Sequence, residues 1–439
     1  MKKESSQMSQ MSIAGGHPLS GTVRAQGAKN AALPIMAASL LLSDSTLGVR
    51  RVPQLDDMTV MRKLLASLGI KIESRGEELY LTSPSELSWE TPERLVRLMR
   101  ASSLVLGPLL SRCGKAKLPL PGGCAIGSRP IDLHLKGFAK MGADITLEHG
   151  AVVATAKELR GCRIYLDFPS VGATENLMMA ATLARGETLI ENAAREPEIT
   201  NLAEVLRSMG ADIRGEGTGT IHVKGKRELQ GSRVEVIPDR IEACTYLLAG
   251  IMTGGSVTVC DIIPEHMDAL VAKLEEMGLE VLVEGKSVTV PSQKRGRGIS
   301  LKALPYPGFP TDLQPQMTAL LSLADGTSVI QDGVFESRFL HINELQKMGA
   351  DIRMQGNAVV ITGVPFLNGA DVVATDLRAG AALVLAGLAA KEETRILNMG
   401  HVHRGYENLE EKFRSLGAQV KMLPDEFIPS SGENPSEED

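Results

Sequence analysis

One pattern of hydrophobic and polar residues recurs six times along the chain. In each copy, an amphipathic segment typical of a helix ends in Leu or Met, and a glycine and a β-type run follow. Each glycine occupies the position at which a left-handed residue caps a helix C-terminus. The glycines, spaced by 68 to 73 residues, are Gly69, Gly142, Gly210, Gly278, Gly349 and Gly417. This regular spacing predicts a protein built from six copies of one structural unit.

Further elements flank this signature in each unit. A helix of small residues and a strand precede it, as in ENLMMAATLARG (175–186) and ETLIENA (187–193). Two short strands around a turn follow it, as in 221–239. The order of elements is helix, strand, helix, strand, strand, which predicts an α/β fold.

The sixth copy is incomplete at its C-terminal end. Residues 13–29 are similar in phase and turn chemistry to residues 361–377, which follow the fifth copy. We therefore expect the N-terminal strands to complete the last repeat, with three repeats in each of two domains. The predicted segments are a tail at 1–11, a first domain at 29–237, a second domain at 12–28 plus 238–424, and an acidic disordered tail at 425–439.

Composition excludes several classes of protein. The net charge of the 439 residues is −6, and no basic stripe points to nucleic acid. No apolar run approaches the roughly 18 residues that a membrane span needs. The five cysteines are widely spaced without a CxxC pair, which fits neither a disulfide framework nor a zinc site. We expect a cytoplasmic protein that acts as a monomer, without nucleic-acid or membrane partners.

Mainly polar and charged residues stand at the junction between the last strand of one unit and the first helix of the next. They are Lys29 and Asn30, Arg100, Ser170, Val171 and Gly172, Asp239 and Arg240, Thr311 and Asp312, and Asp376 and Arg378. Helix N-termini attract anions. The aspartates have an alternative role as N-caps. A cation at such an end opposes the helix dipole, so Lys29, Arg100 and Arg378 favour a doubly charged anionic ligand.

The loop around Cys124 is a candidate for chemistry. Pro121, Gly122 and Gly123 predict a bent, exposed loop, and this copy of the repeat is longer than the third one. Arg129 follows five residues after the cysteine, and a nearby cation favours the reactive thiolate. The alternative is a surface turn with an incidental thiol.

Known phosphate-binding and metal-binding motifs are missing from the sequence. No GxxxxGK[ST] or GxGxxG loop is present, so separate basic side chains must hold any phosphate. His401 and His403 form an HxH pair without a third ligand in view, which is more often a surface feature. We expect no metal and no cofactor.

Ten motifs together resemble the UDP-N-acetylglucosamine 1-carboxyvinyltransferase family of enolpyruvyl transferases. The resemblance runs from about residue 13 to residue 423, and the motifs occur in order within it. The motifs are GAKNAALP (27–34), MRAS (99–102), LPGGC (120–124), SRPIDLH (128–134), SVGATEN (170–176), AAREPEI (193–199), PDRIEA (238–243), FPTDLQ (309–314), ATDLRA (374–379) and RGYE (404–407).

This resemblance implies a fold and a reaction. The fold is a two-domain inside-out α/β barrel of six βαβαββ units, three per domain. The reaction transfers enolpyruvate from phosphoenolpyruvate to the 3′-hydroxyl of UDP-N-acetylglucosamine by addition and elimination, and opens peptidoglycan synthesis.

The resemblance also implies roles for individual residues. Cys124 resembles the general acid, which also adds to phosphoenolpyruvate covalently, and Asp312 and Lys29 resemble the other catalytic residues. The implied phosphoenolpyruvate site consists of Lys29, Asn30, Arg129, Arg338, Arg378 and Arg404. The implied nucleotide-sugar site consists of Arg100, Arg129, Pro130, Ile131, Asp132, Leu133, Ser170, Val171, Gly172, Asp312 and Val334.

The chain departs from the family pattern at two places, and two other functions stay open. Phe168 stands where some members carry a lysine near the uridine, and Ala25-Gln26 replaces the more usual Ile-Ser. A sister enolpyruvyl transferase acting on shikimate 3-phosphate would share the repeats and the basic residues. A silent paralogue that only binds nucleotide-sugar is the second alternative. The presence together of Lys29, Cys124, Asp312 and Arg404 argues against it.

Overall fold

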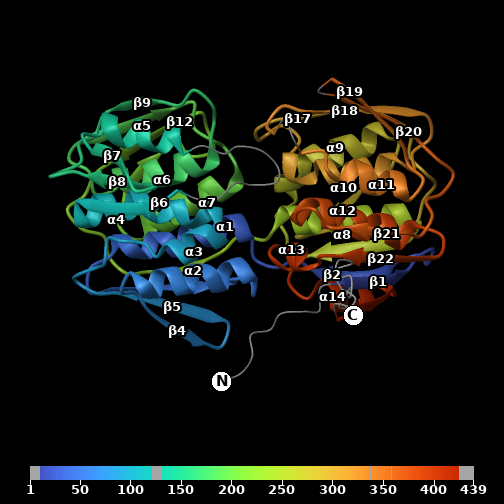
Figure 1. The fold of residues 1–439 in the computed structure, drawn as a ribbon, viewed down its shortest axis with the longest axis horizontal. Coiled ribbons are helices and arrows are strands. Elements are labelled where there is room, and N and C mark those ends of the chain that lie inside the picture. The colour runs from blue at the N-terminus through green and yellow to red at the C-terminus, as the bar shows by residue number, and fades with distance from the viewer. Residues whose placement is uncertain (1–9, 121–130, 336–337, 357, 425–439) are drawn as a thin grey trace, which may run out of the picture.

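The computed structural model describes residues 10–120, 131–335, 338–356 and 358–424. Its elements form two lobes that lie side by side (Figure 1). One hydrophobic core is built from residues between 28 and 236, and the other from residues 11–25 together with 241–420. We propose that these two cores are the two domains expected from the repeats. The C-terminal tail predicted at 425–439 lies outside the described residues.

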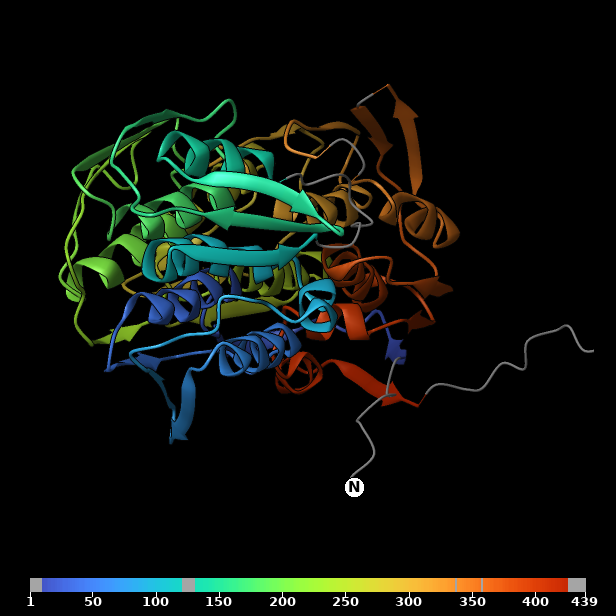
Figure 2. The same cartoon turned by 60° about the vertical axis from the view of Figure 1, so that its left-hand side comes forward.

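Three largely buried helices lie inside each lobe. Their small residues let the helices approach closely, and α8, α10 and α12 pack against one another. The strands lie outside these helices, which is the inside-out arrangement that the sequence resemblance implies (Figures 1 and 2). The inner helices are α1 (Lys29–Ala38), α4 (Leu106–Cys113) and α6 (Val171–Ala181) in one lobe, and α8 (Arg240–Thr253), α10 (Gln314–Leu321) and α12 (Leu377–Ala389) in the other.

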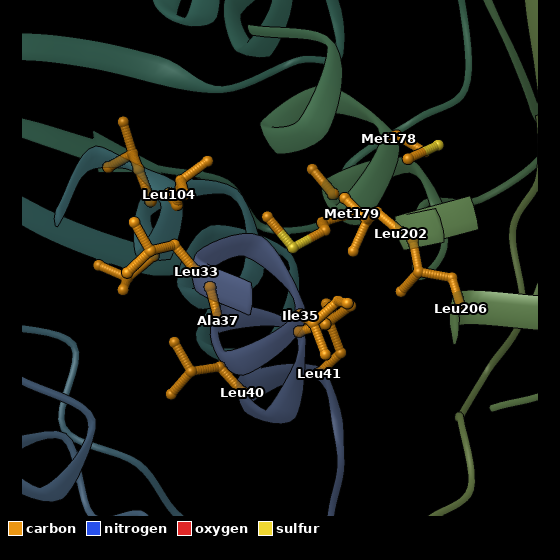
Figure 3. Close-up of a cluster of buried hydrophobic side chains, with 14 of the residues drawn as sticks. Leu33, Ile35, Ala37, Leu40, Leu41, Leu104, Met178, Met179, Leu202 and Leu206 are labelled. Atoms are coloured by element: carbon orange, nitrogen blue, oxygen red, sulfur yellow. The ribbon is translucent and has the colours of Figure 1, made fainter. Parts of the chain in front are cut away.

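Aliphatic side chains from distant segments fill the first core. Leu33 and Ile35 of α1 lie near Met179 of α6 and Leu202 of α7 (Pro197–Ser208), as Figure 3 shows. All four side chains are at most 3% exposed. The first core is therefore packed mainly with aliphatic side chains and methionines, in a chain that is only 3% aromatic.

In the part of the chain that the structure describes, six sheets surround the inner helices, and five of them have four strands arranged in the same order. The first lobe contains β13-β3-β5-β4 (Arg233–Glu235, Ser45–Arg50, Glu78–Ser83, Lys71–Arg75), β6-β8-β7 (Lys115–Pro119, Ala151–Thr155, Asp144–Glu148) and β9-β10-β12-β11 (Arg163–Tyr165, Glu187–Glu191, Thr220–Lys224, Asp212–Arg214). The second lobe contains β2-β14-β16-β15 (Ser20–Arg24, Ser256–Cys260, Ser287–Val290, Leu282–Glu284), β17-β18-β20-β19 (Ser300–Ala303, Thr327–Asp332, Ala358–Thr362, Asp351–Gln355) and β21-β22-β1-β23 (Asp371–Val373, Glu393–Leu397, Gln10–Ala14, Gln419–Leu423).

The last strand of each repeat joins the sheet of another repeat. Strand β9 ends the second repeat but pairs in parallel with β10 of the third, and β13 returns to β3 of the first. In the three-stranded sheet, a single bridge between Glu90 and Lys117 takes the place of the fourth strand. Each ring of three repeats is closed by this exchange.

The N-terminal strands complete the second ring. Strand β1 lies antiparallel between β22 and β23, with Ile13 opposite both Thr394 and Val420. Strand β2 pairs in parallel with β14. The predicted tail at 1–11 is two residues too long, because the strand begins at Gln10 and Met11 is fully buried; residues 1–9 lie outside the described residues.

A second helix in each repeat covers the outside and ends at the repeated glycine. All six glycines have positive φ, between 80° and 110°, as the predicted cap requires. These helices are α2 (Asp56–Ser67), α5 (Asp132–Lys140), α7, α9 (Asp268–Glu276), α11 (His341–Lys347) and α14 (Leu409–Ser415). The other helical segments are α3 (Glu93–Leu98), α13 (Gly400–His403), η1 (Ser39–Leu41), η2 (Arg100–Val105), η3 (Pro264–Met267) and η4 (Thr311–Leu313).

Candidate functional site

Two segments of the chain cross between the lobes, and they lie side by side. Ala28 N–H donates to Ile237 O at 2.7 Å, and Asp239 N–H donates to Gln26 O at 2.9 Å. Helix α1 begins immediately after the first crossing, at Lys29. The crossing therefore places Lys29 at the boundary between the two cores, and Asn30 follows it as an exposed residue.

Asp57 connects Lys29 with Arg404. Its Oδ2 lies 2.8 Å from Nζ of Lys29, and its Oδ1 lies 2.8 Å from Nε of Arg404. Burial alone would raise the pKa of the Asp57 carboxyl, but the two cations hold it below its usual value. Arg404 follows α13 in the second lobe, whereas Asp57 belongs to α2 in the first, so the pair joins the lobes across their boundary (Figure 1).

Gln26 fixes the segment that carries Arg404. Its Nε2 donates to Gly405 O at 3.0 Å, and its Oε1 accepts from Glu407 N–H at 2.8 Å. Because the two backbone groups define which end of the amide is which, both contacts are satisfied only in this orientation. The segment before α1 is thus held against the segment after α13.

Asp312 lies between two buried arginines. Its Oδ1 is 2.8 Å from Nη1 of Arg338, and its Oδ2 is 2.9 Å from Nη2 of Arg378. Both arginine side chains are 4% exposed, whereas the Asp312 side chain is 24% exposed. The carboxylate is held rigidly and keeps one face toward solvent.

Tyr406 holds Arg378 in place through a buried hydrogen bond. Tyr406 is 1% exposed. Its hydroxyl oxygen accepts hydrogen bonds from Nη1 of Arg378 at 3.3 Å and from Nε2 of Gln316 at 3.2 Å. It also shares a 2.9 Å hydrogen bond with Thr245. Burial lowers the pKa of the Arg378 guanidinium, but the Asp312 carboxylate more than offsets this and raises it above its usual value.

The end of β18 is tied to the same cluster. Thr311 accepts from Nη1 of Arg338 at 3.1 Å and donates to Oδ2 of Asp332 at 2.6 Å. The other oxygen of Asp332 accepts from the backbone N–H groups of Val334 and Phe335. Val334, predicted at the nucleotide-sugar site, is therefore positioned next to the arginine pair.

The aspartates at the repeat junctions divide into two kinds. Asp239 and Asp376 accept two backbone N–H groups each, at the starts of α8 and α12, so the N-cap interpretation is confirmed for them. Asp312 lies within η4 instead, and two buried arginines hold its carboxylate.

The first lobe contributes the other predicted residues. Arg100 begins η2, and Ile131, Asp132 and Leu133 lie at or next to the start of α5. Ser170, Val171 and Gly172 form the start of α6. Phe168, just before it, is 39% exposed. Cys124, Arg129 and Pro130 lie outside the described residues.

Positive charge dominates the described part of this site. Four cations (Lys29, Arg338, Arg378 and Arg404) face two carboxylates (Asp57 and Asp312). Burial lowers the pKa of the Lys29 ammonium, Asp57 opposes this, and Arg378 and Arg404 lower it further, so these cations act on one another. Among the described residues, no group of His, Cys, Asp or Glu is arranged to hold a metal. The cluster is suited to an anion with two charged groups.

The residues that support these charges carry no signal in the sequence that would distinguish them. Asp57 looks like an ordinary acidic residue in a first helical turn. Tyr406 lies within the RGYE motif, but nothing in the motif indicates its contact with Arg378. Thr311 is distinguished in the sequence only by its position at a repeat junction.

Comparison with known sequences finds relatives that match most of the chain. Residues 13–413 match the family model described as EPSP synthase (3-phosphoshikimate 1-carboxyvinyltransferase). The chain is 53% identical over 403 residues to UDP-N-acetylglucosamine 1-carboxyvinyltransferase 1 of Caldanaerobacter subterraneus subsp. tengcongensis, covering 92% of this chain and 97% of that one. It is 51% identical to UDP-N-acetylglucosamine 1-carboxyvinyltransferase 2 of Carboxydothermus hydrogenoformans, covering 95% and 100%.

Solved structures share the architecture. The enolpyruvyl transferase NikO from Streptomyces tendae superimposes with a TM-score of 0.86 at 27% identity, covering 95% of this chain and 99% of that one. An EPSP synthase from Acinetobacter baumannii gives a TM-score of 0.73 at 20% identity, covering 95% and 100%. At that identity, the second likeness concerns the fold alone.

Proposed function

The chain belongs to the UDP-N-acetylglucosamine 1-carboxyvinyltransferase family of enolpyruvyl transferases, and we propose the reaction that this membership carries. The enolpyruvyl group of phosphoenolpyruvate is transferred to the 3′-hydroxyl of UDP-N-acetylglucosamine, and phosphate is released. The reaction commits the sugar nucleotide to peptidoglycan synthesis. The protein is proposed to be cytoplasmic. Its five widely spaced cysteines, which form no disulfide framework in the sequence pattern, agree with a reducing compartment.

The observation that carries the proposal is the set of cations gathered from both lobes. Phosphoenolpyruvate bears a phosphate and a carboxylate. Lys29 and Arg404 on one side and Arg338 and Arg378 on the other supply charge-assisted donors for both groups without a metal. Arg129 and Asn30 are proposed to complete this half of the site.

Asp312 is proposed to act as the general base. It takes the proton of the sugar hydroxyl while that oxygen forms a bond to C2 of phosphoenolpyruvate. Cys124 is proposed to deliver a proton to the vinyl carbon C3, which gives a tetrahedral adduct. Loss of a proton from C3 and departure of phosphate from C2 then restore the double bond in the product.

The nucleotide-sugar is proposed to lie along the first lobe. The starts of α5 and α6 and Arg100 belong to that lobe, whereas Asp312 and Val334 belong to the second. A ligand that contacts both lobes would draw them together, and the hydrogen-bonded crossing at Ala28 and Asp239 is the natural hinge.

A phosphate-release assay tests the proposal and separates it from its rivals. The chain should release phosphate when it receives phosphoenolpyruvate and UDP-N-acetylglucosamine together, and not with either one alone. Release with shikimate 3-phosphate instead would establish the sister activity, to which the name of the family model refers. Binding of UDP-N-acetylglucosamine without any phosphate release would establish the silent paralogue.

A further inference from the structure

The turn at residues 404–407 connects two cations of the candidate site. Arg404 opens the turn and pairs with Asp57 of the first lobe. Tyr406 follows two residues later, and its hydroxyl oxygen accepts a hydrogen bond from Nη1 of Arg378 at 3.3 Å. The conformation of this turn therefore influences the spacing between Arg404 and Arg378.

Hydrogen bonds from two sides hold the backbone of this turn. On one side, Val402 O accepts from the N–H groups of Gly405 and Tyr406, at 3.0 and 3.1 Å. On the other side, the Gln26 amide donates to Gly405 O at 3.0 Å and accepts from Glu407 N–H at 2.8 Å. Gln26 thus binds both chain neighbours of Tyr406. It is 7% exposed, so water has little access to replace these contacts.

The backbone of Gln26 is itself fixed at the crossing between the lobes. Its N–H donates to Oε2 of Glu242 at 2.7 Å, and its carbonyl accepts from Asp239 N–H at 2.9 Å. Both partners belong to the start of α8, and Glu242 is fully buried. A side chain on a backbone that is already fixed loses less conformational entropy when it binds two groups. Gln26 therefore forms a rigid connection from the crossing to the turn at 404–407.

Close packing also ties this turn to the start of α12. A Cβ atom on Gly405 would lie 2.7 Å from both δ carbons of Leu377. Leu377 begins α12 and directly precedes Arg378, which is 3% exposed. Because a close-packed interior transmits displacements, a shift of the turn would reach Arg378 through Leu377 as well as through the Tyr406 hydroxyl.

We propose that Gln26 is a positioning residue for phosphoenolpyruvate binding, because its amide fixes the turn that sets the spacing between Arg404 and Arg378. This inference rests on the proposed function, since it takes phosphoenolpyruvate as the ligand. Phosphate and carboxylate are joined within one small molecule, so the cations that bind them must be held at a matching distance. Gln26 acts only through these cations and makes no contact with the ligand in this role.

Gln26→Met tests this role, because methionine has a similar length and volume but cannot make either amide contact. We expect phosphoenolpyruvate to bind about 3- to 10-fold more weakly, the usual effect of losing one neutral hydrogen bond. Binding of UDP-N-acetylglucosamine should be unchanged, which a general loss of structure would not produce. If Gln26→Met does not fold, Gln26→Asn gives the same test, since its amide is one methylene too short to reach both backbone groups.

Gln293→Met is the matched control for calorimetry with the two substrates. The Gln293 amide makes the same pair of contacts, accepting from Glu280 N–H at 2.7 Å and donating to Glu280 O at 3.1 Å, but at the surface. Its loss should leave both affinities unchanged. Wild-type affinity for phosphoenolpyruvate in Gln26→Met, or an equal loss for both substrates, would overturn the proposal.

Combined substitutions show whether Gln26 acts through the two cations. The effect of Gln26→Met on phosphoenolpyruvate binding should shrink in an Arg404→Met background, and shrink again when Tyr406→Phe is added, because each change removes one route. An undiminished effect in that background would overturn the proposal.

The same measurements separate this inference from the proposed function. If the wild-type protein binds phosphoenolpyruvate more tightly than Gln26→Met does, yet releases no phosphate with both substrates, the proposed function fails and the role of Gln26 stands. If phosphate is released but Gln26→Met binds phosphoenolpyruvate as the wild-type protein does, only the role of Gln26 fails. A wild-type protein that neither binds phosphoenolpyruvate nor releases phosphate would overturn both.

Discussion

Asp57 of the first lobe is paired with Arg404 of the second, with 2.8 Å between Oδ1 and Nε. The same carboxylate holds Lys29, which begins α1 directly after the crossing between the lobes. The buried Asp57 carboxylate, which no sequence motif marks, therefore sets the distance between Lys29 and Arg404. Both residues are proposed to bind phosphoenolpyruvate. The carboxylate also links the two cores across the site.

Replacing Asp57 by Asn should destabilise the protein. The change leaves Lys29, whose side chain is 13% exposed, without its counter-ion. The free energy of unfolding should fall by about 1.5–3 kcal/mol, most of it from Lys29 because Arg404 is more exposed. Denaturant unfolding measures this. Glu73→Gln is the matched control, since Glu73 also lies between two cations, Lys71 and Arg75, but on the surface. An equal effect of both changes would contradict the argument.

Removing either cation beside Asp57 should affect one substrate only. Lys29→Met and Arg404→Met should weaken phosphoenolpyruvate binding by about 10- to 100-fold, since each removes a charge-assisted contact. Binding of UDP-N-acetylglucosamine should be unchanged. Calorimetry with each substrate is the measurement, and Lys421→Met, which changes an exposed residue of β23, is the control. Equal losses for the two substrates would mean that these residues serve the fold.

Most of the architecture could be predicted from the sequence because it repeats. Six glycines at regular spacing defined the outer helices, and the similarity of 13–29 to 361–377 placed the N-terminal strands with the last repeat. The exchange of strands between repeats could not be predicted. Strand β13 pairs with β3, almost two hundred residues earlier, and a local pattern of hydrophobic residues carries no information about the partner.

The candidate site was predictable where motifs or helix starts marked it, and not elsewhere. Asp239, Asp312 and Asp376 occupy equivalent junctions, and each is compatible with an N-cap. Only the fold shows that Arg338 and Arg378 converge on Asp312, because these arginines come from different repeats. The supporting contacts of Asp57 and Tyr406 likewise depend on long-range packing.

Cys124 should be the fastest of the five cysteines to react with an epoxide phosphonate. Burial raises the pKa of the Cys113, Cys162 and Cys244 thiols, which keeps them protonated and slow. Mass spectrometry after brief labelling identifies the modified residue. Earlier labelling of Cys113 or Cys260 would contradict the prediction. Cys124→Ser should lose most turnover, whereas Cys124→Asp, still an acid, should retain some.

Glu175 should make stability fall as the pH rises. It is 3% exposed on α6, and burial, with help from Glu198 and Glu196, raises its pKa well above the usual value. Above the ordinary glutamate pKa, the folded protein therefore keeps a proton that the unfolded chain has lost. The free energy of unfolding should then decrease by about 1.4 kcal/mol per pH unit for this proton.

Glu175→Gln should remove that part of the slope, because the amide does not titrate. Denaturant unfolding at a series of pH values from about 5 to 8 measures it, starting just above the ordinary glutamate pKa. Glu187→Gln, which changes an exposed carboxylate on β10, should leave the slope as it is. Identical slopes in the wild-type protein and Glu175→Gln would show that Glu175 is ionised in the folded state.

Asp312→Asn should separate binding from turnover. The amide has the size of the carboxylate and still accepts a hydrogen bond from Arg338 or Arg378, so UDP-N-acetylglucosamine should still bind. It cannot accept the proton of the sugar hydroxyl, and turnover should therefore fall by about 10²–10⁴, the usual contribution of general base catalysis. Phosphate release at saturating substrates, together with calorimetry, measures the two effects. Asp325→Asn, at an exposed turn beyond the other end of α10, is the control. Turnover of Asp312→Asn near the wild-type rate would exclude Asp312 as the base, and the arginine pair would then have to be explained by substrate binding alone.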